Sequence, residues 1–295
     1  MFIRRLPRFE YHAPTTIPEA LKLMTKYGNK ASVLAGGTDL LVAMKNREKV
    51  PEHLINLKGI AKLKGIHFDK KKGMTLGALT TMAELEHASL VKEKFRPLWD
   101  AVTVMASPQV RTLGTIGGNL CGAVPSADMA PPLIVLGASV RLVGPKGRRT
   151  VPVESFFKGP KESVLRKNEI LSEIFIPSPP PGASGVYLKL MRRQALDLAL
   201  VGAAAYLKFD SKKKICKEAR VALGAVAPTP IRVFEAEEVL TNKEVNETAA
   251  AEAGKAASVV CRPISDIRAS HEYRCSMVEV LIKRAVLEAL KRANG

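Results

Sequence analysis

The segment that most constrains the fold is a run of proline and glycine at residues 177–185, with the sequence Pro-Ser-Pro-Pro-Pro-Gly-Ala-Ser-Gly. Proline fixes the backbone angle φ and removes an amide donor, whereas glycine frees the backbone, so this composition favours a linker. The run therefore predicts two domains, at residues 1–176 and 186–295. A chain of 295 residues is long enough for two hydrophobic cores.

In the first part, helical and extended patterns alternate. Apolar residues recur at helical spacing over residues 16–27, with Thr16 as a candidate N-cap, and again over 81–90 and 98–107. A short apolar run at 31–35 predicts a strand. Two hairpins are expected, one over 66–68 and 74–76 and the other over 140–143 and 149–153. Together these patterns favour an α+β or mixed-sheet domain.

The second part mixes the same two patterns. Residues 185–190 and 219–226 are predicted to be strands, and residues 276–293 an amphipathic helix that ends in basic residues. The apolar run at 198–207 is typical of either a buried strand or a buried helix, because periodicity does not distinguish the two in a short run. An α+β fold is again expected.

The overall charge and hydropathy narrow the classes of protein. No apolar stretch approaches the roughly 20 residues that span a bilayer, and no secretory leader is recognisable, so we expect a cytoplasmic protein. The formal net charge of +18 raises the alternative of a nucleic-acid-binding protein. The lysines and arginines lie in short runs at turn-like positions, however, and aromatic residues make up only 5%. A solvated basic face is therefore favoured, followed by attraction to an acidic protein partner.

Two glycine loops carry the clearest functional signal. In the first, a strand is followed by Gly36 and Gly37, and then by Thr38 and Asp39, whose side chains are candidates to cap the next helix. The second contains a similar set of small residues around Gly117. Neither loop matches a G-x-G-x-x-G or G-K-[ST] phosphate motif, and either alone fits an ordinary turn. Both loops in one domain could hold a pyrophosphate from two sides.

Other reactive residues are scattered along the chain. The five histidines show no metal-ligand helical spacing, and the four cysteines form no C-x-x-C pair, so neither a metal site nor an iron–sulfur ligand set is predicted. No catalytic nucleophile with its base is recognisable. Glu235, Glu237 and Glu238 are expected to be solvated on a helix.

The ordered set of these and other motifs resembles the flavoprotein subunits of molybdenum hydroxylases, such as the carbon monoxide dehydrogenase medium subunit and the xanthine dehydrogenase FAD-binding domain. Besides the two loops, the resemblance rests on Phe9 to Pro14, Ser107 to Arg111, Asn168 to Ile174 and Ala222 to Pro230, and covers nearly the whole chain. It implies a FAD-binding domain of the vanillyl-alcohol-oxidase/MurB-like type, with subdomains at about 1–57 and 58–176, followed by the family's C-terminal α+β domain.

The resemblance also implies site residues for a non-covalent FAD. The positions expected to surround its pyrophosphate and ribose are Val33, Leu34, Ala35, Gly36, Gly37, Thr38, Asp39 and Leu40 in the first loop, and Thr115, Ile116, Gly117, Gly118 and Asn119 in the second. Asp128 matches a carboxylate that holds the nucleotide, Leu171 a backbone contact to the isoalloxazine edge, and Lys189 a basic residue beside the ring.

The sequence departs from the family at two positions and lacks an insertion found in one member. Met105 replaces an aromatic residue of xanthine dehydrogenase, although a thioether also packs on an aromatic face. Leu198 stands where carbon monoxide dehydrogenase has a tyrosine over the flavin. Cys121 matches the first ligand of an additional iron–sulfur cluster in one relative, but the cysteine-rich insertion is absent here, so no cluster is expected.

By resemblance, the chain is an electron-transfer subunit without substrate chemistry of its own. The expected partners are a large subunit with molybdopterin and a small subunit with 2Fe-2S clusters, assembled as a dimer of heterotrimers. The alternatives are a stand-alone flavin oxidoreductase of the same superfamily and a basic nucleic-acid-binding or scaffold protein. The sequence indicates neither the substrate of the assembly nor the electron acceptor.

Overall fold

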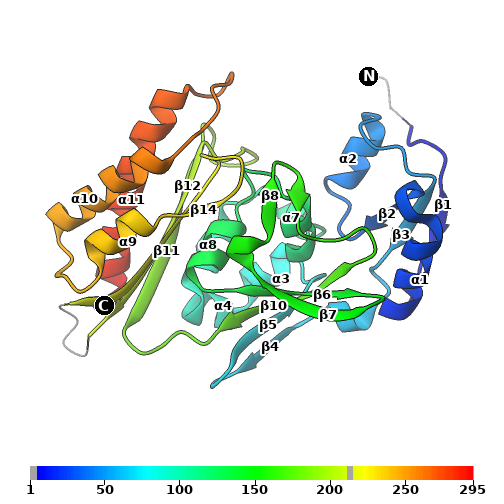
Figure 1. The fold of residues 1–295 in the computed structure, drawn as a ribbon, viewed down its shortest axis with the longest axis horizontal. Helices are drawn as coiled ribbons and strands as arrows, with labels where there is room; N and C mark the ends of the chain where they lie inside the picture. The colour runs from blue at the N-terminus through cyan, green and yellow to red at the C-terminus, as the bar shows by residue number, and fades with distance from the viewer. Residues whose placement is uncertain (1–4, 211–214, 295) are drawn as a thin grey trace.

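The computed structural model describes residues 5–210 and 215–294. The three larger β-sheets of the described residues follow one another along the long axis of the molecule (Figure 1), beginning with a small N-terminal sheet and ending with a sheet that carries the C-terminal helices. Within the described residues, no helix is both long and apolar enough to cross a membrane.

The N-terminal sheet has three parallel strands in the order β1-β3-β2: β1 (Glu10–His12), β3 (His53–Asn56) and β2 (Ala31–Leu34). Parallel neighbours need crossover connections. The helices α1 (Ile17–Tyr27) and α2 (Leu40–Lys45) lie within the two crossovers. The hydroxyl of Thr16 caps α1 by accepting a hydrogen bond from the Glu19 amide, which confirms this predicted N-cap.

The central sheet has five antiparallel strands in the order β4-β5-β10-β6-β7. Both predicted hairpins are present in it. The strands are β4 (Ile66–Asp69), β5 (Gly73–Gly77), β6 (Ser139–Gly144), β7 (Gly147–Pro152) and the central β10 (Ile170–Pro177). The segment between β5 and β6 forms α3 (Met82–His87), α4 (Ser89–Lys94), α5 (Arg96–Thr103), α6 (Pro108–Arg111), α7 (Ile116–Gly122) and α8 (Ala130–Val135). A small hairpin of β8 (Phe157–Gly159) and β9 (Glu162–Ser163) precedes β10.

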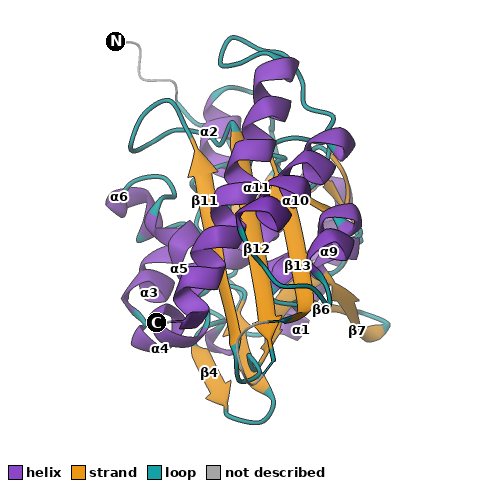
Figure 2. Ribbon diagram, turned by 90° about the vertical axis from the view of Figure 1, so that its left-hand side faces the viewer, coloured by secondary structure: helices purple, strands orange, loops and turns teal. Residues whose placement is uncertain are grey.

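The third sheet is antiparallel, in the order β11-β12-β13-β14. Its strands are β11 (Ala183–Leu190), β12 (Val201–Phe209), β13 (Cys216–Gly224) and β14 (Ile231–Arg232). Figure 2 shows α10 (Glu247–Val260) and α11 (His271–Asn294) lying across one face of this sheet. The helix α9 (Phe234–Leu240) packs beside them against β13, and α5 and α8 cover the opposite face.

This two-sided burial resolves the ambiguous apolar run at 198–207, most of which is strand β12. Val201, Ala203 and Ala205 face the C-terminal helices, whereas Ala204 and Tyr206 face the central core. A strand buried on both faces needs apolar residues at every position, which removes the alternation that would have identified it.

Several predicted boundaries are wrong. The single helix expected over 81–90 is divided at Ala88, whose extended backbone ends α3 and begins α4. The helix expected over 98–107 ends at Thr103; Ser107 is extended because Pro108 follows it, and its hydroxyl caps α6. The linker expected over 177–185 is also shorter, because Pro177 belongs to β10 and Ala183 begins β11. Antiparallel pairing extends both strands into the proline- and glycine-rich run.

Glu237 corrects the expectation of a solvated carboxylate cluster. Its side chain is buried, accepts a hydrogen bond from the Val221 amide and pairs with Arg232 at 2.8 Å. It therefore joins α9 to strand β13 rather than facing water. The helix pattern correctly placed this residue on a helix but gave no sign that β13 and β14 would cover it.

One buried ion pair joins the C-terminal helix to the central layer. Asp100 on α5 accepts from the Arg292 guanidinium at 2.6 Å and from the Tyr187 amide at 3.2 Å, and also pairs with Arg96 at 2.9 Å. Its side chain is only 9% exposed. These contacts connect α5, β11 and α11 at a single carboxylate.

Replacing Asp100 with alanine is expected to lower the free energy of unfolding by about 3 kcal/mol, because the variant leaves Arg292 and the Tyr187 amide without their acceptor. Urea unfolding followed by circular dichroism measures the change. Arg284→Ala, which removes an exposed charge from the same helix as Arg292, is the control and should change stability by less than about 0.5 kcal/mol. Equal stability of the Asp100 variant and wild type would contradict this role.

Candidate functional site

The first glycine loop leaves the end of strand β2 and turns into α2. Gly37 has φ of +86°, a conformation that residues with a side chain rarely adopt. Gly36 is packed so closely that an added Cβ would overlap the carbonyl oxygen of Leu113. The first loop therefore lies directly against the backbone that leads into the second loop.

The second glycine loop is formed where residues 112–115 lead into α7. The Thr115 hydroxyl caps this helix by accepting from the Gly118 amide at 3.1 Å. Gly117 donates to the Ala78 carbonyl, and a Cβ added to Gly117 would lie 2.6 Å from that oxygen. A Cβ added to Gly118 would lie 4.0 Å from the Ala35 methyl group. The structure thus brings the two loops together, as the clamp hypothesis requires.

The expectation that Thr38 and Asp39 cap α2 with their side chains is wrong. Asp39 occupies the N-cap position, but its backbone is already helical, with φ −99° and ψ −46°, and its side chain makes no capping hydrogen bond. An extended N-cap backbone is what normally turns the side chain toward the first helical amides. Since α2 has only six residues, the loop backbone rather than a long helix dipole has to supply the attraction for an anion.

Asn119 provides independent evidence that this region binds a ligand. Its side-chain oxygen Oδ1 is buried and accepts no hydrogen bond among the described residues. A buried polar atom without a partner costs about 1–3 kcal/mol, so such atoms are rare in folded proteins. A ligand that donates a hydrogen bond would remove this cost, and Asn119 lies on the same helix as Gly117 and Gly118.

Two further predicted site residues, Asp128 and Lys189, form a buried charge pair. Asp128 accepts from the Lys189 ammonium at 2.9 Å and from the Tyr187 hydroxyl at 2.8 Å. Burial raises the pKa of the Asp128 carboxyl, and the neighbouring Lys189 ammonium and the two hydrogen bonds oppose that rise. Burial and the proximity of Asp128 raise the pKa of Tyr187 well above its usual value, so Tyr187 remains a neutral donor.

The C-terminal sheet supplies two of these three groups. Tyr187 and Lys189 are two residues apart on β11, so both point to the same face of the sheet. Tyr187 packs in the central core on that face, whereas Val186 belongs to the core under the C-terminal helices. Tyr187 was not among the predicted site residues. The signal for it was its two-residue spacing from Lys189 in a predicted strand.

Hydrogen bonds connect this charge pair to the remaining predicted residues through the segment 104–106. Lys189 donates to the Val104 carbonyl at 3.4 Å, and Arg111, which precedes the second loop, donates to the Met105 carbonyl at 2.7 Å. The Leu196 amide donates to the Ala106 carbonyl at 3.3 Å, which places the chain next to Leu198 beside Met105. Arg111 is itself held by two hydrogen bonds to Glu86.

Leu171 is connected to the second loop through Ala78. The side chain of Leu171 is buried in the central core, and the register of β10 shifts just after it, at a bulge. The next residue, Ser172, accepts a hydrogen bond from the Ala78 amide, while the Ala78 carbonyl accepts from Gly117. Any role of Leu171 toward a ligand therefore falls to its backbone, as the sequence comparison implied.

Four apolar side chains in or near these segments are exposed to solvent. Leu113, Leu196 and Leu198 have 53%, 57% and 52% of their surface exposed, and Val33 has 36%. Each lies in or next to one of the segments just described. A surface hollow of about 420 Å³ beside the β6–β7 turn, lined by Arg148 and Arg166 among others, contains none of the predicted site residues.

The cysteines and histidines take separate positions. Cys121, Cys216, Cys261 and Cys275 are free thiols. His12 and His53, by contrast, are brought within 3.3 Å of each other across two strands. No helical spacing could have predicted that contact, because it depends on strand pairing.

This geometry defines the class of protein: an α+β fold in which two glycine loops meet, with a buried, unpartnered Asn119 side-chain oxygen on the helix that follows the second loop, fits a nucleotide-type ligand. Comparisons with known proteins identify the family. Residues 7–179 match the FAD binding domain in molybdopterin dehydrogenase, and residues 186–289 match the CO dehydrogenase flavoprotein C-terminal domain. The chain belongs to the family of FAD-binding medium subunits of the carbon monoxide dehydrogenase and xanthine dehydrogenase type.

Individual relatives agree over nearly the full length. The carbon monoxide dehydrogenase medium chain of Hydrogenophaga pseudoflava is 36% identical over 97% of this chain and 98% of the relative. A putative xanthine dehydrogenase FAD-binding subunit of Escherichia coli is 32% identical over 97% of each. The solved structure of a Hydrogenophaga pseudoflava carbon monoxide dehydrogenase that lacks the Mo-pyranopterin moiety superposes with a TM-score of 0.93 at 37% identity, covering 98% of this chain and 99% of that chain. For quinoline 2-oxidoreductase from Pseudomonas putida, the TM-score is 0.91 at 30% identity, covering 98% of this chain and 99% of that chain.

Gly36→Ala is expected to reduce the FAD content of the purified protein at least about tenfold, because the added methyl group forces the first loop away from the Leu113 backbone. Flavin absorbance per chain is the measurement. Gly122→Ala is a matched control on α7, where an added Cβ meets nothing within 4 Å and improves helix propensity. Retention of normal FAD content by the Gly36 variant would contradict the close-approach argument.

Lys189→Met is expected to lower the free energy of unfolding by about 3 kcal/mol at neutral pH, since it leaves the Asp128 carboxylate buried without its cation. The pKa of Asp128 should then rise further. An acid whose pKa is raised by folding loses stability as pH increases, so the defect should grow from pH 5 to pH 8. Urea unfolding at saturating FAD measures it.

Lys189→Met combined with Asp128→Asn removes both charges and is the test of this explanation. The double variant should recover most of the lost stability and lose the pH dependence. A defect in Lys189→Met that is the same at every pH would show that burial of Asp128 is not its cause.

Proposed function

We propose that the chain binds one FAD non-covalently at the two glycine loops and serves as the electron-transfer subunit of a molybdenum hydroxylase. The observation that carries the proposal is the contact between the loops beside the unpartnered Asn119 oxygen. The residues fit the cofactor: glycine backbone can approach a pyrophosphate closely, and a ribose hydroxyl can donate to Asn119. FAD exchanges electrons one or two at a time, which suits a relay between one-electron and two-electron partners.

In this proposal the site residues have distinct tasks. Residues 33–40 hold the pyrophosphate and ribose through backbone amides and the Thr38 and Asp39 side chains. Residues 115–119 contribute through the Thr115 and Asn119 side chains, because the Gly117 and Gly118 amides already donate within the protein. Asp128 retains an acceptor lone pair on each oxygen toward a nucleotide hydroxyl. Lys189 supplies a positive charge, and its hydrogen bonds to Asp128 and to the Val104 carbonyl fix the position of that charge. The Leu171 backbone, Met105 and Leu198 border the ring system, and the exposed leucine leaves one face open to an acceptor.

The partners are proposed from the relatives, which include medium chains and FAD-binding subunits of multi-subunit dehydrogenases. The chain would associate with a molybdopterin-binding large subunit and a small subunit carrying 2Fe-2S clusters, as a dimer of heterotrimers in the cytoplasm. We also propose a domain boundary within residues 177–185, because the first family match ends at residue 179 and the second begins at residue 186. Substrate chemistry would belong to the large subunit, since none of the site residues described above forms a nucleophile–base pair.

Purification of the chain with its native complex should give a flavin absorbance spectrum, and acid treatment should release about one FAD per chain, as non-covalent binding requires. Iron and molybdenum should co-purify and remain with the companion chains after dissociation. A colourless chain that does not take up added FAD would contradict the proposal. FAD binding by a chain that associates with no iron- or molybdenum-containing protein would instead support a stand-alone flavin oxidoreductase.

A further inference from the structure

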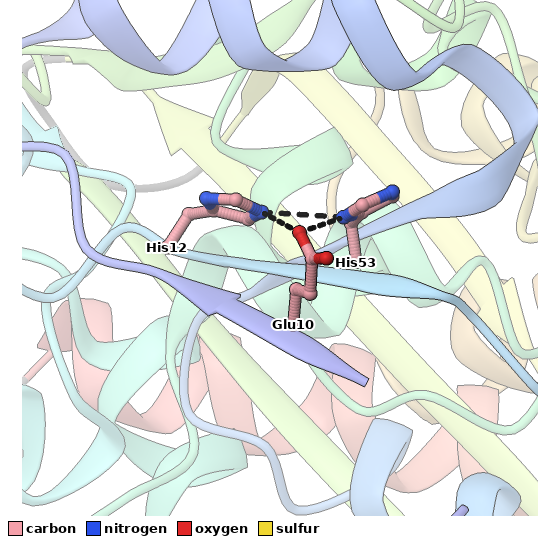
Figure 3. A group of neighbouring side chains, drawn as sticks. All are labelled: Glu10, His12 and His53. Carbon is pink, nitrogen blue, oxygen red and sulfur yellow. Dashed lines mark hydrogen bonds and ion pairs between the residues drawn. The ribbon is translucent and has the colours of Figure 1, made fainter. Parts of the chain in front are cut away.

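Three potential metal ligands converge on the N-terminal sheet, at strands β1 and β3. Glu10 and His12 are two residues apart on β1, so their side chains lie on the same face of the sheet. Glu10 is paired in register with His53 on the adjacent strand β3. Figure 3 shows the two imidazole rings and the carboxylate turned toward one another. Their ligand atoms all lie within 4.8 Å of one another.

The distances between these atoms match a single small cation. His12 Nε2 lies 3.3 Å from His53 Nδ1, and Glu10 Oε2 lies 3.2 Å from His53 Nδ1 and 3.9 Å from His12 Nε2. A triangle with these edges has a centre about 2.0 Å from every corner, close to the Zn–N and Zn–O distances of about 2.0–2.2 Å. Two imidazoles and a carboxylate are also ligands that zinc accepts in proteins.

The rings are held in this arrangement by their surroundings. Tyr27, at the end of α1, stacks on His53 with 3.6 Å between ring centroids and on His12 with 5.0 Å. The side chains of His12 and His53 are only 20% and 13% exposed, so packing restrains both rings. The Glu10 side chain is 72% exposed, which leaves a side open for an ion to enter and for water to complete its coordination.

From this geometry we propose that Glu10, His12 and His53 form a binding site for one divalent metal ion of the zinc class. The site is separate from the glycine loops, because His53 pairs with Ala31 at the start of β2, whereas the first loop follows Leu34 at its end. Its role is structural: the ion joins β1 to the central strand β3 and stabilises the sheet from which the first glycine loop emerges. This assignment does not depend on the function proposed above.

The test is calorimetric titration of ZnCl₂ into the full-length, tag-free protein with FAD bound, after removal of metals with a chelator. Wild type should bind one Zn²⁺ per chain at this site, and Zn²⁺ should raise its melting temperature. Glu10→Gln and His53→Gln should weaken that binding at least about tenfold, the lower end of the effect of losing even a ligand's supporting hydrogen bond. His67→Gln, an exposed histidine on β4, is the matched control and should bind as wild type does.

The outcomes separate clearly. Loss of Zn²⁺ binding in both site variants with unchanged FAD content supports the proposal. Absence of binding in wild type, or binding by Glu10→Gln and His53→Gln as tight as that of wild type, overturns it. Glu10 is mostly exposed, so Glu10→Gln decides the question even if His53→Gln fails to fold.

Discussion

The close approach of the first glycine loop to the carbonyl of Leu113 is the constraint on which the site depends. No residue with a Cβ fits at Gly36, and Gly117 is equally closed off by Ala78, so glycine at these positions is required by packing between loops as much as by a ligand. The contact crosses from the parallel N-terminal sheet to the helices beside the central sheet. This steric fit, together with the buried core that Ala20 and Ile55 share with Leu79 and Ile170, positions the N-terminal sheet and brings the two glycine loops together. This explains why each glycine pair alone resembles an ordinary turn while the two together do not.

The fold was largely predictable wherever local chemistry determines it. The N-cap at Thr16 and the two hairpins depend on neighbouring residues, and their positions followed from the sequence. The strand β12 was not distinguishable from a helix, since its two faces pack against different layers and both are apolar. The break at Ala88 opposes the helix propensity of alanine and is followed by the fully buried Val91 and Phe95, so packing rather than local preference sets it. Burial of Glu237 likewise depends on strands distant from it in the sequence.

The sequence predicted individual residues of the candidate site but not the hydrogen bonds and ion pairs between them. The family resemblance predicted Asp128 and Lys189 as site residues. Only the structure shows that they form an ion pair and that the Tyr187 hydroxyl also donates to Asp128. The pairing weakens the electrostatic field of Lys189 at the ring, because a cation neutralised by a buried carboxylate exerts a weaker field than a free one. Several arginines are also paired with carboxylates. Arg111, Arg149 and Arg292 each have a carboxylate oxygen within 3.0 Å. Such pairing neutralises part of the arginine charge, and the surplus behind the net charge of +18 lies with other basic residues.

Strand β3 connects the proposed metal site at Glu10, His12 and His53 to the first glycine loop. It is the middle strand of the N-terminal sheet and pairs with β1 on one side and β2 on the other. His53 lies at its beginning, opposite both Glu10 and Ala31, and Asn56 at its end pairs with Leu34 just before Gly36. On one face of the sheet, the buried core among the described residues is small and consists of Leu34, Met44 and Leu54, whereas Ile55 on the other face of β3 joins a larger core. A bond between β1 and β3 would reduce the freedom of the sheet as a whole, and the loop at the end of β2 would be held more firmly against Leu113.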